Sequence, residues 1–297
     1  MSHIETKPAA TLLMGAPGTG KTTSLISYIE AGLELFVVIT DPGGEEALID
    51  QVIKSGADIN KLHWKYIPAA ATSWATAEAV ASRVNTMSYE ALGALKQGLE
   101  KQEYKQFLQV MACLRDFTCD RTGLSYGAVN EWDSTRALAI DSMTGINKMA
   151  KRLVVGAKPT IHQGEWGTAM EIEEQFLDLL VGNTKCFVCC IAHIQRTKDE
   201  LRGTTHIAVD LLGTKLAPKI PHMFSDVVLA VKDESKFNWS TTHPGVDLKA
   251  RTLPLANNLK PSFVQIVEGW RKRQAAIAVL EKDVVKEELT VPISTTT

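Results

Sequence analysis

Residues 15–22, GAPGTGKT, have the composition and spacing of a loop that binds phosphate. They match the pattern G-x-x-x-x-G-K-[ST] at every fixed position. Glycines let backbone N–H groups close around a phosphate, the lysine reaches the outer phosphate oxygens, and the threonine hydroxyl ligates Mg²⁺. We therefore predict that a nucleotide contacts Gly15, Ala16, Pro17, Gly18, Thr19, Gly20, Lys21, Thr22 and Thr23.

The segments around this loop are the ones that the motif requires. Apolar residues 11–15 predict a strand, and the apolar periodicity of residues 21–32 predicts a helix. A glycine-rich turn without nucleotide is the alternative, but strand, loop and helix coincide here.

A second acid is needed to hold the metal through water, and it normally ends a neighbouring strand. Asp141 follows the apolar run RALAI and is the natural candidate, with Thr22 as the other Mg²⁺ ligand. An aspartate that caps a helix or forms a turn is the alternative. Asp41, after the strand-like run LELFVVIT, is a competing acid, and Glu45 and Glu46 follow it closely. The sequence does not choose the residue that activates water among these last three.

The strand-like run CFVCCIAHI ends near His193, and Gln195 follows two residues later. Residues two apart on a strand face the same side. In open α/β sheets ligands bind beyond the carboxyl ends of the strands. Both residues are therefore candidates for sensing a γ-phosphate and moving the following loop, although a histidine satisfied by nearby backbone is the simpler alternative.

The order of the remaining elements predicts an α/β protein with a mostly parallel sheet, flanking helices and antiparallel strands at the C-terminal end. Strands are also expected at HWKYIP, in DVVLAVKDESKFNWSTT and in VDLKARTL, and helices at 76–117 and 169–181. We expect one domain at 1–270, with a helical insertion at about 76–135. A charged helix and a frayed tail should occupy 271–297.

Composition narrows the possible partners. The 297 residues carry a formal charge of −2, so a nucleic acid would have to bind local patches. No run of 18 apolar residues or secretion signal occurs, which predicts a cytoplasmic protein without a membrane partner. The five cysteines are expected to be reduced and buried. Cys186 and Cys189 have zinc-ligand spacing, but on a strand that spacing turns their side chains to opposite faces.

These segments together resemble the RecA-like P-loop ATPases, and among them phage-encoded nucleotide-binding proteins of the AAA/RecA-like type associated with recombination. The resemblance is carried by GAPGTGKTT, GEWGTAMEIEEQF and CCIAHIQR, with ALAIDSMTG, LLGTKLAPKIPHMFSDVVLAV and DLKARTLPLANNLKPSF. It covers most of residues 11–270. It implies a RecA-like core that binds ATP and Mg²⁺, in the cytoplasm of a host cell if the protein is phage-encoded.

The resemblance also implies a homo-oligomer, a ring or a filament, with nucleotide between subunits. A basic residue of the neighbouring subunit would then complete each site, and Lys249 and Arg251, two apart on the strand expected at VDLKARTL, are the candidates. A solvated basic edge strand is the alternative. The loop after His193, with Arg196, Lys198 and Arg202, and the loop with Trp166 lie where such proteins contact single-stranded DNA. A solvated loop and a core or interface tryptophan are the alternatives.

The sequence departs from a minimal RecA core at the long insertion near residues 90–135, and no acid after HWKYIP matches the one that RecA uses to activate water. We expect an ATPase that acts on single-stranded DNA in recombination, annealing or replication. The alternative is a P-loop ATPase that remodels or chaperones a protein partner without nucleic acid. A small-molecule kinase is disfavoured, because no arginine-rich lid segment is present.

Overall fold

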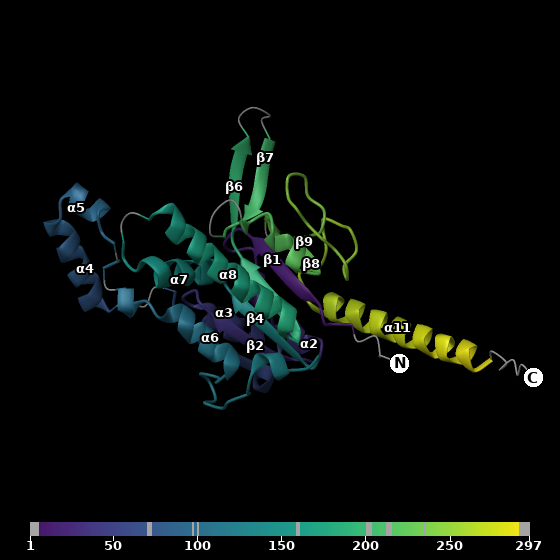
Figure 1. Ribbon diagram of the computed structural model, residues 1–297. Helices are drawn as coiled ribbons and strands as arrows, with labels where there is room; N and C mark the ends of the chain where they lie inside the picture. Colours follow the sequence, from purple (N-terminus) through teal and green to yellow (C-terminus); the bar gives the residue numbers. More distant parts are fainter. Residues whose placement is uncertain are drawn as a thin grey trace, which may run out of the picture.

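The computed structural model describes residues 6–69, 73–96, 98–99, 101–158, 161–199, 204–211, 216–234 and 236–290. A 7-stranded sheet with the order β3-β2-β4-β5-β1-β8-β9 forms its centre (Figure 1). Strands β3, β2, β4, β5, β1 and β8 are parallel, and only the last strand of this sheet, β9, runs antiparallel to its neighbour. The α/β class expected from the sequence is confirmed, including antiparallel pairing toward the C-terminal end.

The strands of this sheet are short apolar segments. They span β1 Ala10–Gly15, β2 Glu34–Ile39, β3 Leu62–Tyr66, β4 Arg136–Asp141, β5 Phe187–Ala192, β8 Asp226–Asp233 and β9 Lys236–Ser240. Every residue of β1 and β5 is buried, as expected for strands covered on both faces. Two further strands, β6 Ile194–Asp199 and β7 Thr204–Val209, form a separate antiparallel hairpin.

Helices cover both faces of the sheet. The helices comprise α1 Lys21–Ser24, α2 Ser27–Glu30, α3 Gly44–Ser55, α4 Trp74–Thr86, α5 Tyr89–Gly93, α6 Gln106–Arg115, α7 Met143–Val155, α8 Gln163–Asn183, α10 Ile220–Met223 and α11 Val264–Thr290. Three short 3-10 turns lie at Ile59–Lys61, Lys101–Glu103 and Val129–Glu131. One core cluster contains apolar residues of α6, α7 and α8, and the other contains residues of α2, α3 and α11.

Alternation along each strand explains the two cores. In β1, Leu12 and Met14 join the cluster under α7 and α8, whereas Leu13 between them joins the cluster under α2 and α3. The same alternation divides the cysteines, because Cys186 belongs to the first cluster and Cys189 to the second. All five thiols are buried, and burial raises the pKa of the Cys186 thiol to about 12.

Three parts extend away from the sheet in Figure 1: the β6–β7 hairpin, the α4–α5 pair and the distal part of α11. None of the residues of α4 and α5, all of which the structure describes, is buried. Trp74 and Tyr89 at the starts of these helices are 93% and 83% exposed. Across the described residues, no helix is both long and apolar enough to span a bilayer.

Several elements differ from the sequence-based expectation. The helix expected at 21–32 is two short helices, because Leu25 and Ile26 donate to Thr22 and Thr23, three residues back. The helical region at 76–117 is divided into α4, α5 and α6. The loop expected after His193 contains the β6–β7 hairpin, and α8 begins within the loop expected before residue 169.

The C-terminal region also differs. The strand expected at residues 246–253 is reduced to isolated bridges at Val246 and Lys249. The C-terminal helix starts at Val264 instead of near residue 271, since its first turns carry Ile266 and Val267, which are buried in the core.

Candidate functional site

The phosphate-binding loop follows β1 directly and requires glycine at several positions. Gly18 and Gly20 have positive φ values of 71° and 77°, a backbone conformation that glycine adopts without a Cβ clash. A Cβ on Gly15 would lie 2.6 Å from the Ala230 carbonyl oxygen of β8. The Thr19 hydroxyl donates to the Ala16 carbonyl at 2.8 Å and closes the loop from inside.

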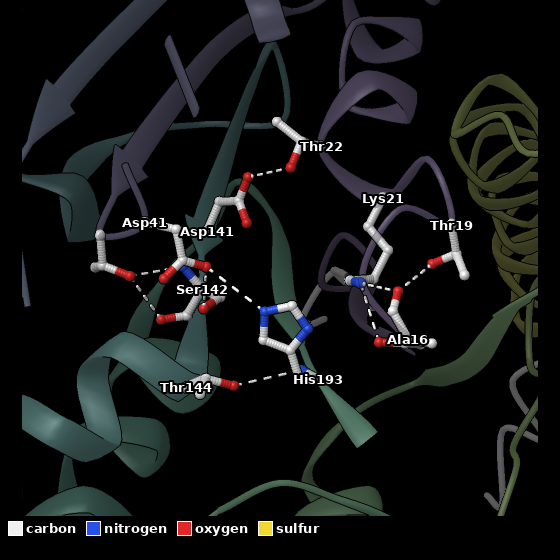
Figure 2. A network of polar contacts seen from close by, with 11 residues as sticks. Ala16, Thr19, Lys21, Thr22, Asp41, Asp141, Ser142, Thr144 and His193 are labelled. Atoms are coloured by element: carbon white, nitrogen blue, oxygen red, sulfur yellow. Dashed lines mark hydrogen bonds and ion pairs between the residues drawn. The ribbon is translucent and has the colours of Figure 1, made fainter. Parts of the chain in front are cut away.

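Lys21 points back into this loop (Figure 2). Its ammonium donates to the Gly15 and Ala16 carbonyl oxygens at 3.0 and 2.8 Å. The residue is only 6% exposed, and burial lowers the pKa of the ammonium while Asp141 and Asp41 act in the opposite direction. The loop therefore holds a buried cation whose present partners are neutral carbonyl groups.

Asp141 and Thr22 meet across the cleft beside the loop. The Thr22 hydroxyl donates to Asp141 Oδ2 at 2.6 Å. Parallel pairing of β2 with β4 places Asp141 next to Ile39, so the acid stands at the same sheet edge as the loop. Burial raises the pKa of Asp141 to about 6, although the Thr22 hydroxyl and Lys21 favour the charged form. A hydroxyl beside a carboxylate is the oxygen donor set that suits Mg²⁺, so the residues fit this metal.

Asp41 and His193 form the next layer of the site (Figure 2). The Ser142 hydroxyl donates to Asp41 Oδ2 at 2.7 Å, and His193 Nε2 lies 3.7 Å from the same oxygen. The contact with His193 is the main reason why the pKa of Asp41 is lowered. The His193 backbone N–H donates to Thr144 Oγ1 at 3.4 Å, which links the end of β5 to the start of α7.

Thr40 fixes the ends of the two acid-bearing strands. Its hydroxyl accepts from the Ser142 backbone N–H at 2.8 Å and donates to the Ser142 carbonyl at 3.1 Å. Gly145 on α7 lies so close that a Cβ there would be 2.0 Å from the Thr40 hydroxyl oxygen. This close approach packs the first turn of α7 against the end of β2.

These residues line one cleft of about 870 Å³. Pro17 to Thr23, Asp41, Asp141 and His193 all line it, within the size range of small-ligand sites. Glu45 and Glu46 are in the first turn of α3 and are not among the described residues that line it. The structure therefore favours Asp41 over the two glutamates as the acid nearest to a bound phosphate.

The other predicted residues lie outside this cleft. Gln195 and Arg196 are exposed on β6, and the cleft ends at His193. Lys198 is a residue of β6, and Arg202 lies outside the described residues. Trp166 is in the first turn of α8 and not in a loop, where it is partly buried with the Lys151 ammonium 5.1 Å from its ring centroid.

Lys249 and Arg251 lie beside the start of β8, at the amino ends of the parallel strands, whereas the loop follows the carboxyl end of β1. Lys249 forms a bridge with Val227, near the start of β8, and its ammonium donates to the Phe224 carbonyl at 2.7 Å. The Arg251 backbone N–H donates to Asp226, and its side chain is exposed. The prediction that Lys249 and Arg251 lie on one face of a regular strand is therefore wrong.

Several residues that line the cleft were not predicted from the sequence, and three of them lie far from the loop along the chain. Phe237 on β9 and Lys260 and Pro261 after it form a wall beside the loop. The only sequence signal is an aromatic residue in a polar hairpin, KDESKFNWS, and it does not indicate which strand face carries it. A second cleft of about 560 Å³, near Lys7 and Trp270, contains none of the motif residues.

The sheet topology and the loop define an α/β protein with a P-loop fold. No protein-family description matches the sequence, and no curated protein matches it. Among solved structures, the RadB recombinase matches over 84% of this chain and 84% of its own, at 11% identity and a TM-score of 0.40. An ATP synthase subunit, NeqB from Nanoarcheaum equitans, matches over 82% of this chain and 51% of its own, at 12% identity and a TM-score of 0.38. Both TM-scores are below 0.5, so neither neighbour assigns an activity to this chain.

Proposed function

We propose that this protein binds and hydrolyses ATP with Mg²⁺ as a RecA-like homo-oligomer, and that it acts on single-stranded DNA in recombination, annealing or replication. The observation that carries the ATPase proposal is the Thr22–Asp141 contact of 2.6 Å beside the buried Lys21, within one cleft. A motif lysine and a magnesium-ligand hydroxyl, both on α1, thus converge with a second acid at the end of β4.

Each residue has a distinct task in this proposal. Lys21 would exchange its two loop carbonyls for phosphate oxygens, since a charged acceptor binds an ammonium more strongly. Thr22 would hold Mg²⁺ directly and Asp141 through water. Bound Mg²⁺ would neutralise charge on the phosphates during transfer to water.

Asp41 is the residue proposed to orient the attacking water. Its lowered pKa keeps it ionised near neutral pH, and the Ser142 hydroxyl fixes one of its oxygens. His193 contacts that same oxygen and directly precedes β6, so a change at the phosphate can reach the hairpin through one residue. The Asp210 backbone N–H donates to the His193 carbonyl at 2.9 Å, which ties both ends of the hairpin to this residue.

The DNA part of the proposal rests on the β6–β7 hairpin. It projects from the body (Figure 1) and follows His193 directly. Arg196 on β6 is exposed. Because the whole chain is close to neutral, the hairpin would have to supply local charge, and binding should weaken steeply with salt.

The test is ATP hydrolysis with and without single-stranded DNA, at low and moderate salt, with the mass measured in the same samples. We expect an oligomer whose hydrolysis is stimulated by DNA and whose stimulation fades as salt rises. Lys21→Ala should lower nucleotide affinity and hydrolysis at least about tenfold, since it removes the cation of the loop. Hydrolysis without any DNA binding would instead support the protein-remodelling alternative, and wild-type protein that binds no ATP would refute both.

A further inference from the structure

We propose that Phe237 and Pro261 form a slot that holds the base of the nucleotide, and that this slot selects purines by stacking. The inference rests on the proposed function, because it concerns the same cleft. It adds the residues that would recognise the base, and the reason why a purine would bind better than a pyrimidine, neither of which the loop motif specifies.

Phe237 lies directly against the phosphate-binding loop. A Cβ on Gly20 would lie 3.3 Å from Cδ1 and 3.4 Å from Cγ of the phenyl ring. The side chain nevertheless remains 43% exposed and lines the same cleft as Lys21. A large apolar ring is thus held open to solvent at the loop, on the side away from Asp141, since β5, β1 and β8 separate β9 from β4.

One strand bridge brings the segment with Pro261 close to β9. Trp239 and Leu259 exchange two backbone hydrogen bonds of 2.8 Å each, as an antiparallel pair does. In an antiparallel pair, residues before Trp239 and residues after Leu259 lie at the same end of the bridge, so Phe237 and Pro261 are each two residues from it at that end. The ladder stops there, since the chain turns at Pro261, where the Ser262 N–H donates to the Lys260 carbonyl, and both Phe237 and Pro261 line the cleft.

The wall that carries Pro261 is anchored to the segment after the loop. The Phe263 backbone N–H donates to the buried Ser27 hydroxyl on α2 at 2.7 Å. The Phe263 ring stacks on Tyr28 with a centroid separation of 4.2 Å. The Phe263 ring also meets the Trp239 ring of β9 at a centroid separation of 4.8 Å, so both sides of the slot are held by the same part of the core.

The chemistry of these walls favours stacking over reading of the base edge. Neither the Phe237 nor the Pro261 side chain has a hydrogen-bonding group, so ring area sets the affinity, and a purine offers more than a pyrimidine. The Lys232 ammonium lies 5.7 Å from the Phe237 ring centroid on an exposed side chain. Such a chain can move aside for a base and then contact the nucleotide from the rim.

The test compares the binding of ATP, GTP, CTP and inorganic tripolyphosphate, each with Mg²⁺, by calorimetry on the full-length protein. Tripolyphosphate has the phosphates without a base, so it isolates the contribution of the loop. We expect wild-type protein to bind ATP and GTP about tenfold or more tightly than tripolyphosphate, with CTP between them. Phe237→Ala should lower ATP affinity about tenfold and leave tripolyphosphate affinity unchanged.

Two further variants separate stacking from general effects. Phe237→Trp should retain the preference for ATP, and Tyr89→Ala, which removes an exposed aromatic ring on α5, should leave all affinities unchanged. The inference is overturned if Phe237→Ala lowers the affinities for ATP and tripolyphosphate equally, or lowers neither. Wild-type protein that binds neither ligand would overturn the proposed function itself, and the slot with it.

Discussion

Three ionisable residues of the cleft, Lys21, Asp141 and Asp41, influence one another's protonation. Lys21 favours the charged form of Asp141, and Asp141 and Asp41 both oppose the lowering of the Lys21 pKa by burial. Asp41 keeps a lowered pKa because His193 and Ser142 contact it, whereas burial dominates at Asp141. Two acids at neighbouring strand ends therefore have different environments and pKa shifts of opposite direction.

His63 is a second buried ionisable residue, on β3 and away from the cleft. Its ring stacks between Phe36 at 4.6 Å and Tyr126 at 4.3 Å, measured between ring centroids. Neither ring nitrogen has a hydrogen-bond partner among the described residues. Burial lowers the pKa of His63 to about 4, Glu34 opposes this shift, and Arg121 and Arg136 add to it.

This environment predicts a loss of stability in acid. The unfolded chain binds a proton at His63 below about pH 6.5, whereas the folded chain does so only near pH 4, so the free energy of unfolding falls as the pH drops between these values. We expect His63→Phe to remove about 2 kcal/mol of this loss, measured by urea unfolding at pH 7 and pH 4.5. His243→Gln, at an exposed histidine, should leave the slope unchanged, and equal slopes for wild type and His63→Phe would contradict the prediction.

At the scale of elements, the sequence predicts strands that are buried on both faces better than it predicts edges. The runs before Asp41, Asp141 and His193 are continuous and apolar, and each forms a parallel strand of the sheet. Their shared carboxyl edge follows from parallel pairing, so most of the phosphate side of the cleft could be predicted. The base side could not, because it depends on a single bridge between Trp239 of β9 and Leu259 and on the turn that follows.

The segment at residues 246–253 shows why an alternating pattern can fail. Its alternation predicts a strand, but the buried Asp226 carboxylate accepts hydrogen bonds from the backbone N–H groups of Arg251 and Thr252 and from the Thr252 hydroxyl. These donors are therefore unavailable for a regular ladder beside β8. A single carboxylate from a distant part of the chain thus overrides the local pattern.

The hydrogen bonds that Asp226 accepts should make a measurable contribution to the free energy of unfolding. Asp226→Ala should lower the free energy of unfolding by about 2–4 kcal/mol, because three donors lose a buried charged acceptor. Thr252→Val removes only the hydroxyl contact and should cost about 1 kcal/mol. Urea unfolding measures both costs. ATP affinity should stay unchanged, because Asp226 is at the start of β8 and the loop follows the far end of the neighbouring strand β1. A cost below that of Thr252→Val would show that Asp226 is not the anchor.

At the scale of the whole molecule, the two ends of the parallel strands have separate tasks in the proposed oligomer. The loop, Asp141 and His193 lie at the carboxyl edge, whereas Lys249 and Arg251 lie near the start of β8. Neither basic residue is among the described residues of the cleft. If they act on phosphate, they must do so in the cleft of another subunit. Arg251 is the better candidate, since the Lys249 ammonium is already bound to the Phe224 carbonyl.

This geometry predicts that sites can be rescued by mixing subunits. Arg251→Ala alone should reduce hydrolysis at least about a hundredfold, as loss of a charge that stabilises the transferring phosphoryl group does, while ATP affinity stays within about threefold. Arg115→Ala, at an exposed arginine on α6, should change neither. In an equimolar mixture of Lys21→Ala and Arg251→Ala subunits, about one quarter of the head-to-tail interfaces combine an intact Lys21 with an intact Arg251. Hydrolysis should return to about that fraction of the wild-type rate, and no recovery in subunits shown to exchange freely would exclude Arg251 as a residue that acts between subunits.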